Sequence, residues 1–261
     1  MFAQNPTPEQ RHRALELVME IGAALMENGA EVFRVQQTMY IIAHALHLRE
    51  FTVYVIANGI FATAGTNELS ALRHIPICGM HLGRVTELNA LSRDMAEGRV
   101  ENITQAEMRV AFIRAIPPSP PWAQVAASSA GAAFFAMMFG GTLADGLAAA
   151  ACGLALGCFQ GWSERHSMAP IFARLLGSAL VYLLGQSIAA ACAAVQPDAA
   201  IIGALLVLTP GVAFTSAVRD LLHGDYLSGS IRLTDAFLSA GAMACGVFVS
   251  YKLIEWGRAL L

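Results

Sequence analysis

The stretch AAIIGALLVLTPGVAFTSAV, residues 199–218, decides the fold class of this chain. It contains no charged side chain, and about twenty mostly apolar residues are what an α-helix needs to cross a bilayer. Thr209, Pro210 and Gly211 fall near its middle. Proline removes a backbone donor there, and glycine adds conformational freedom. The stretch therefore predicts a membrane span that is interrupted at mid-depth.

Further apolar runs of similar length lie on both sides of this stretch. Together they predict an α-helical polytopic membrane protein with about five transmembrane helices. The expected spans lie near residues 122–139, 142–161, 171–195, 199–218 and 233–254.

The overall composition agrees with a membrane protein. Of the 261 residues, 56% are hydrophobic and only 13% are charged, whereas a soluble domain has about 25% charged residues. The formal net charge is −3, which leaves no basic surface for phosphate backbones. These values argue against an ordinary soluble enzyme and against a nucleic-acid-binding protein.

The chain before residue 122 has a different character. Residues 1–121 contain ten arginines and twelve acidic side chains, as a water-soluble domain does. Four prolines within residues 117–121 stop a helix and act as a stiff spacer. We therefore expect two domains, a small α+β domain over residues 1–121 and a membrane domain over residues 122–261.

Local signals place helices and a hairpin within the first domain. Thr7, Pro8 and Gln10 form a helix start with a capping box, and Asn28-Gly29 forms a helix end. Asn58-Gly59 between two β-rich runs predicts a hairpin. Further helices are expected over residues 31–46 and 83–97, and from a capping box at Thr104-Gln105-Ala106-Glu107 to Pro117.

The arginine distribution predicts the orientation in the membrane. Positive side chains favour the cytoplasmic face. One face would hold Arg109, Arg114, Arg165, Arg174, Arg219 and Arg232, and the other only Lys252 and Arg258. The first domain is therefore expected in the cytoplasm and the C-terminal end outside.

The interrupted span is the candidate substrate site. Unwound backbone at membrane depth is tolerated where it lines a cavity, and many secondary transporters bind solutes there. Thr209, Pro210 and Gly211 are the candidate substrate-binding residues, and Ser178 and Gln186 of the third span can complete a polar lining. The alternative is a proline kink that serves packing alone.

Four charged residues are candidates for coupling or gating. Asp145 lies about one turn inside the second span, where it can carry a proton or simply complement the helix dipole. Arg219, Asp220 and Asp225 follow the interrupted span, either as a gate or partner contact, or as an interfacial collar of charges.

Small residues in the second span indicate close helix packing. Gly153, Gly157 and Gly161 recur every four residues. This spacing lets helix backbones approach closely in lipid, and we expect a tight helix–helix seam along it.

Several motifs, taken in order, resemble the threonine/serine exporter family (ThrE/YjjP-like). The resemblance runs from about Leu15 to Leu253. Its motifs are Glu27-Asn28-Gly29-Ala30-Glu31 with Arg34-Val35, Asn58-Gly59, the stretch 79–98, Gly140-Gly141 ahead of Asp145-Gly146, Thr209-Pro210-Gly211, and Asp220 to Gly229 ahead of Arg232.

The resemblance implies a function and a partner. It implies a subunit of a bacterial inner-membrane exporter that moves small carboxylate metabolites, either threonine- or serine-like amino acids or dicarboxylates such as succinate. It also implies the split form of the family, in which a second small multi-span membrane protein supplies the remaining spans. No enzymatic activity, cofactor, metal or nucleic-acid partner is expected.

Two other functions stay open at this point. One is a membrane-anchored hydrolase, in which His166 or His223 would activate one of the nearby serines. Those serines are Ser163, Ser167 and Ser216. The other is a membrane-tethered regulator whose soluble domain senses a ligand.

Overall fold

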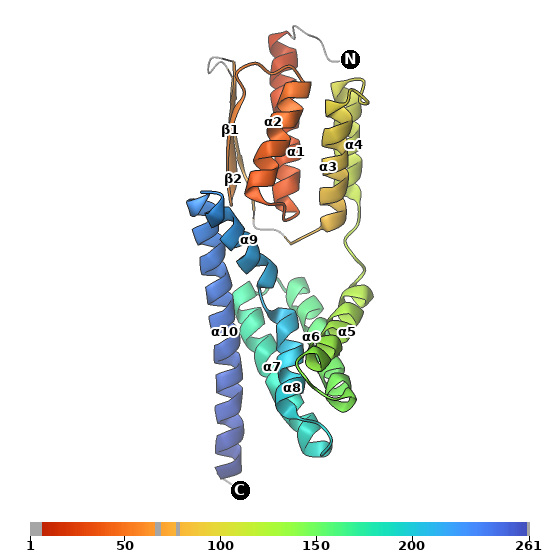
Figure 1. The fold of residues 1–261 in the computed structure, drawn as a ribbon, viewed down its shortest axis with the longest axis vertical. Helices are drawn as coiled ribbons and strands as arrows, with labels where there is room; N and C mark the ends of the chain where they lie inside the picture. The colour runs from red at the N-terminus through yellow and green to blue at the C-terminus, as the bar shows by residue number, and fades with distance from the viewer. Residues whose placement is uncertain (1–6, 66–68, 77–78, 260–261) are drawn as a thin grey trace. The chain divides into compact units, whose positions relative to one another are not determined.

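The computed structural model describes residues 7–65, 69–76 and 79–259, which form helices and one three-stranded sheet (Figure 1). The helices are α1 Pro8–Glu27, α2 Val32–Ala45, α3 Leu82–Ala96, α4 Ile103–Ala115, α5 Pro121–Met138, α6 Leu143–Arg165, α7 Pro170–Ala191, α8 Pro197–Leu208, α9 Gly211–Leu222 and α10 Tyr226–Ala259. The strands are β1 Thr52–Ile56, β2 Gly59–Ala64 and β3 Leu69–His74.

Internal contacts divide the chain into two compact units. The first unit comprises Met1–Pro118 and Thr215–Leu233, and the second comprises Ser119–Phe214 and Thr234–Leu261. The turn between α9 and α10 thus groups with the first unit. The predicted division separates residues that face water from residues that face lipid. Internal contacts do not report on that difference, so the division stays a prediction.

A single apolar core holds the first unit together. Leu15, Val18 and Ile21 lie on one face of α1 and are fully buried, as the helical period of the sequence predicts. Val53 and Val55 alternate with exposed residues along β1 and join the same core. The sheet thus packs one face on the helices, as strands β1 and β2 beside α1 and α2 show in Figure 1.

The ends of α1 are set by the signals read from the sequence. The Thr7 hydroxyl accepts from the Gln10 N–H at 3.3 Å, and the Gln10 side chain accepts from the Thr7 N–H at 2.9 Å. This capping box confirms the predicted helix start. Asn28 caps the other end, and Gly29 follows with φ +84°, a conformation that glycine adopts without strain.

The sheet contains the predicted hairpin and one further strand. β1 pairs antiparallel with β2, with Ile56 opposite Gly59, so Ala57 and Asn58 form the two-residue loop. The hairpin is confirmed, one residue earlier in its turn than the Asn58-Gly59 motif indicates. Strand β3, which the sequence did not predict, pairs antiparallel with β2 and completes the order β1-β2-β3.

Helix α4 begins at a different cap from the predicted one. The Asn102 side chain accepts from the Gln105 N–H at 2.9 Å, so Asn102 rather than Thr104 is the N-cap. Thr104 and Glu107, expected to form a capping box, both accept from the Arg13 guanidinium, Thr104 at 3.0 Å and Glu107 Oε1 at 2.8 Å. The hydrogen bonds from Arg13 hold the pKa of Glu107 below its usual value. This pair therefore ties α4 to α1.

Small residues bring α5, α6 and α8 close together in the second unit. The hydroxyls of Ser128 and Ser129 on α5 donate to the Gly153 and Ala150 carbonyls of α6 at 2.8 and 2.9 Å. A Cβ added at Gly203 of α8 would lie 2.7 Å from the backbone of α5. Packing and hydrogen bonds of this kind replace the hydrophobic force that lipid does not supply.

The apolar helices make this a multi-pass membrane protein. Among the described residues, α6, α7 and α10 are long and apolar enough to cross a membrane, and the bent pair α8 and α9 makes a fourth span if it is counted as one. Five spans were expected. The first expected span, 122–139, corresponds to α5, but the Gln, Ser and Gly residues of α5 dilute its hydropathy and it falls outside this group.

Candidate functional site

The interrupted span is the most distinctive feature of the second unit. Helix α8 ends at Leu208, α9 begins at Gly211, and the two are bent by 54°. Thr209, at the break, has φ −62° and ψ 130°, the extended conformation that a following proline imposes. The break predicted at Thr209-Pro210-Gly211 is therefore confirmed, and Pro210 is its physical cause.

A cavity of about 510 Å³ opens beside the break. It is lined by Tyr182, Leu205, Thr209, Pro210, Ala240, Met243, Ala244, Val247, Phe248 and Tyr251. These residues come from α7, α8 and α10, with Thr209 and Pro210 from the break itself. All ten are uncharged, and their polar groups are the Thr209 hydroxyl and two phenols.

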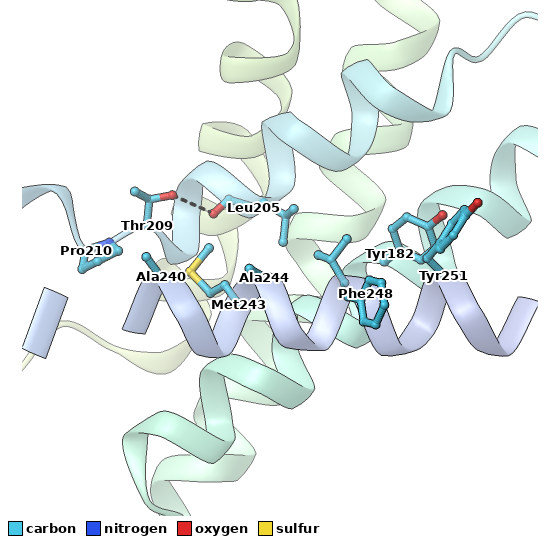
Figure 2. A pocket seen from close by; sticks show the side chains of 10 residues that line it. Tyr182, Leu205, Thr209, Pro210, Ala240, Met243, Ala244, Phe248 and Tyr251 are labelled. Atoms are coloured by element: carbon cyan, nitrogen blue, oxygen red, sulfur yellow. Dashed lines mark hydrogen bonds between the residues drawn. The ribbon is translucent and has the colours of Figure 1, made fainter. Parts of the chain in front are cut away.

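The polar groups lie at opposite ends of the cavity. Figure 2 shows Thr209 and Pro210 at one end, Tyr182 and Tyr251 at the other, and apolar side chains of α10 between them. The Thr209 hydroxyl donates to the Leu205 carbonyl at 3.2 Å, which satisfies one carbonyl that the broken helix leaves free. The cavity thus joins the helix break to a pair of aromatic hydroxyls.

The five predicted substrate-binding residues are distributed unevenly around this cavity. Thr209 and Pro210 line it, and Gly211 follows directly, with its N–H 2.8 Å from the Thr209 carbonyl. Gln186 lies behind the lining, where its amide donates to the Tyr182 hydroxyl at 3.4 Å. Ser178 lies elsewhere. It is fully buried and donates to the Leu175 carbonyl at 2.9 Å.

Ser178 does not line the cavity; it lies at the contact between α7 and α10. A Cβ added at Gly246 of α10 would collide with the Ser178 hydroxyl and the Leu175 carbonyl. The close approach of α10 therefore depends on glycine at 246. A substrate-binding role for Ser178 stays a prediction. Its position favours a role in the packing of α10 against α7.

Several lining residues were missed by sequence reasoning. Tyr182 and Tyr251 are about seventy residues apart, and nothing in the local sequence around either indicates the other. Met243 and Phe248 read as ordinary lipid-facing residues of a membrane helix. Only Gln186, four residues after Tyr182, offers a signal, because residues at i and i+4 share one face of a helix.

Asp145 is fully buried at the start of α6. Its Oδ2 accepts from the Thr142 N–H at 2.7 Å, and the Thr142 hydroxyl oxygen accepts from the Asp145 N–H at 3.3 Å, so the two residues form a capping box. The Thr142 hydroxyl also donates to Oδ2 at 2.8 Å. Its Oδ1 accepts from the Gln196 N–H, the N-cap residue of α8, at 2.6 Å. Each carboxylate oxygen is therefore occupied by a donor. This geometry favours a clamp between two helix starts over a mobile proton carrier.

We predict that Asp145→Asn lowers the amount of folded protein in the membrane. An amide has one accepting oxygen and would place an NH₂ group against at least one backbone N–H. Leaving a buried donor unsatisfied costs about 1–3 kcal/mol. Quantifying the variant in isolated membranes checks this, with Asp198→Asn, in the first turn of α8, as the matched control. Wild-type abundance of Asp145→Asn with a shifted pH profile of export would instead restore the proton-carrier interpretation.

The three gating candidates lie at the α9–α10 turn. Arg219 pairs with Glu31, the N-cap residue of α2, and the neighbouring His223 ring stacks on Phe33 at 4.9 Å between centroids. Asp220 is 2% exposed, and its Oδ2 lies 3.5 Å from the Arg232 Nε. These contacts favour a fixed hairpin over a loose collar of solvated charges.

Asp225 closes this turn through its backbone. Its N–H donates to the Asp220 carbonyl at 2.9 Å, and its own carbonyl accepts from the Gly229 N–H at 2.9 Å. A Cβ at Gly229 would lie 3.0 Å from the Ala217 carbonyl, so glycine lets α10 approach α9 here. The gating role of these residues stays a prediction.

The histidines considered for a hydrolase bind backbone carbonyls. His166 Nδ1 lies 2.8 Å from the Trp162 carbonyl, and His223 Nδ1 lies 2.8 Å from the Arg219 carbonyl. A ring nitrogen that donates to the carbonyl four residues back caps the end of its helix. These bonds occupy Nδ1 and leave Nε2 as the accepting nitrogen, but among the described residues no hydrogen bond joins either ring to one of the three candidate serines, the contact that a nucleophile–base pair uses.

Comparisons with known proteins agree with one another. Residues 16–254 match the family model described as "Putative threonine/serine exporter". A protein of Mycobacterium tuberculosis (strain ATCC 25618 / H37Rv), named "Probable threonine/serine exporter", is 24% identical over 245 residues. The match covers 92% of this chain and 46% of the relative, so the chain spans about half the length of the curated relative it matches. No solved structure matches the chain.

Proposed function

Because this chain belongs to the threonine/serine exporter family, we propose that it forms part of a secondary exporter that moves small carboxylate metabolites out across the inner membrane. The cargo is a threonine- or serine-like amino acid or a dicarboxylate such as succinate. An exporter moves its cargo unchanged, so no enzymatic step is required of this chain.

The break between α8 and α9, with the cavity beside it, is the observation that carries this proposal. An interrupted helix presents backbone groups and an oriented half-helix dipole at little energetic cost. Uncharged cavity walls suit a cargo that must enter and leave the site, because a fixed charge at mid-membrane is expensive and holds its counter-ion tightly.

We also propose a partner and an orientation. The relative has as much sequence again outside the part that this chain matches, and a second small multi-span membrane protein would supply equivalent helices. The first unit, with its many charged residues, would face the cytoplasm, because the arginines near the span ends favour that face. The C-terminal end of α10 would then face outward.

Efflux from right-side-out membrane vesicles tests the proposed function. The vesicles come from the source cells, with the chain deleted or restored, and are loaded with labelled threonine, serine or succinate. We expect restoration of the chain to speed the efflux of at least one of these solutes. Equal efflux with and without the chain would contradict the proposal. Chemical conversion of a solute without movement would favour an enzyme.

A further inference from the structure

The end of the cavity away from the helix break carries two phenol groups that can form hydrogen bonds. Tyr182 of α7 and Tyr251 of α10 both lie there (Figure 2). The Gln186 amide donates to the Tyr182 oxygen at 3.4 Å. Because that oxygen accepts from Gln186, the Tyr182 O–H stays free to donate to a molecule in the cavity.

An ion pair lies beside this end, outside the cavity lining. The Lys252 ammonium is 5.5 Å from the centroid of the Tyr251 ring and 2.6 Å from the Glu255 carboxylate. An ammonium over an aromatic ring is held by the ring quadrupole. The lysine charge is already balanced by Glu255, so the two phenols of the lining are the groups that can donate to a carboxylate here.

The cavity extends along α10 for longer than one small cargo. Ala240 and Tyr251 line the cavity on the same helix and are eleven residues apart (251 − 240), which is about 16 Å at 1.5 Å per residue. A solute the size of one amino acid spans roughly 4–7 Å, since neighbouring Cα atoms are only about 3.8 Å apart. One cargo molecule is therefore shorter than the part of α10 that lines the cavity.

We propose that Tyr182 and Tyr251 form a second station for the carboxylate group of the cargo, distinct from the helix break. Gln186 is a positioning residue that acts through Tyr182. Because Tyr251 lies toward the C-terminal end of α10, this station faces outward in the proposed orientation, and the cargo reaches it after the break. The inference rests on the proposed exporter function.

A structural explanation of the same residues predicts a different outcome. Tyrosine, tryptophan and lysine gather where a membrane helix meets the headgroups, and Tyr251, Lys252 and Trp256 fit that pattern. In that case the phenol oxygens contact water and lipid, and their removal changes membrane abundance rather than the interaction with cargo.

Side-specific inhibition of efflux distinguishes these explanations. Right-side-out vesicles are loaded with labelled threonine or labelled succinate, and the same unlabelled solute is added outside. We expect the Tyr182→Phe/Tyr251→Phe variant to need about tenfold more external solute for half-inhibition. The internal concentration for half-maximal efflux should stay within about twofold of wild type. Tyr226→Phe, on the same helix but outside the cavity lining, is the matched control.

Gln186→Leu tests the positioning role. Alone it should reproduce the Tyr182→Phe shift, and in the Tyr182→Phe background it should add nothing, as a double-mutant cycle measures. The solute that shows the shift identifies the carboxylate as that of an amino acid or of a dicarboxylate.

The outcomes divide clearly. An external shift with an unchanged internal constant supports the second station. No shift, a shift confined to the inside, or equal shifts on both sides overturns it while the exporter function stands. Absence of chain-dependent efflux in wild-type vesicles overturns the exporter function itself.

Discussion

Pro210→Ala is expected to abolish export while the protein still inserts into the membrane. Proline at 210 removes a backbone donor and forces Thr209 into the extended region, with ψ 130°. Alanine restores the N–H, which can donate to the Leu206 carbonyl and join α8 to α9 as one helix. The bend of 54° beside the cavity would then be lost.

We expect this variant to be more stable than wild type although its export activity is lost. A proline inside a helix costs about 3 kcal/mol, so its removal favours the continuous helix. We expect slower amide hydrogen exchange over residues 207–214 in purified Pro210→Ala than in wild type. Such a gain in stability with a loss of function would show that the break is maintained for transport.

Pro170→Ala is the control for the loss of a proline ring as such. Pro170 stands at the first position of α7, where its missing N–H has no helical partner in any case. We expect wild-type export for this variant. Efflux is measured at matched membrane abundance, and wild-type flux in Pro210→Ala would show that the break serves packing alone.

The sequence predicted those features whose causes are local. The capping box at Thr7, the turn near Asn58 and the break at Pro210 each depend on residues within four positions of one another, and the structure contains all three. In each case one or two backbone hydrogen bonds decide the conformation, and short-range residue types determine those bonds.

Features that depend on distant residues were harder to predict. β3 was missed because its alternating pattern includes Arg73 and His74, and its pairing with β2 supplies the stability that propensity does not. The N-cap of α4 was misplaced because two local signals overlap, and the Asn102 cap forms while Arg13, about ninety residues away, engages Thr104 and Glu107. Competition of this kind is visible only once the helices are packed.

In the candidate site, too, residues with local causes were predicted and residues brought together by distant contacts were not. Thr209 and Pro210 were predicted because they interrupt an apolar run. The tyrosines at the other end of the cavity come from α7 and α10, and their meeting depends on how those helices cross. Asp145 was read as a candidate proton carrier because an acid in a span is costly. The Gln196 N–H, fifty-one residues away, instead satisfies one of its oxygens.

The spacing of Gly153, Gly157 and Gly161 predicted one seam, and the structure distinguishes its members. A Cβ at Gly153 would lie 2.6 Å from the Ser128 carbonyl, and one at Gly157 would lie 2.9 Å from the Val125 Cα, both backbone atoms of α5. A Cβ at Gly161 would meet nothing within 4 Å. The contact with α5 therefore explains the glycines at 153 and 157 but not the one at 161.

We expect Gly153→Ala and Gly161→Ala to change stability in opposite directions. At Gly153 the methyl group would push α5 away from α6 and weaken the Ser128 hydrogen bond to the Gly153 carbonyl. Overpacking of this kind lowers the free energy of unfolding by about 1–3 kcal/mol. At Gly161 the methyl group enters open space, and the better helix propensity of alanine contributes up to about 1 kcal/mol.

Unfolding of the two purified variants in the same detergent measures this difference, with the wild-type chain as reference. Both variants make the same chemical change on the same helix, eight residues apart, so detergent and helix propensity affect them alike. The contact with α5 is what differs between them. A Gly153→Ala variant as stable as Gly161→Ala would show that the α5–α6 seam is loose enough to absorb a methyl group, and close packing would then no longer explain the glycine at 153.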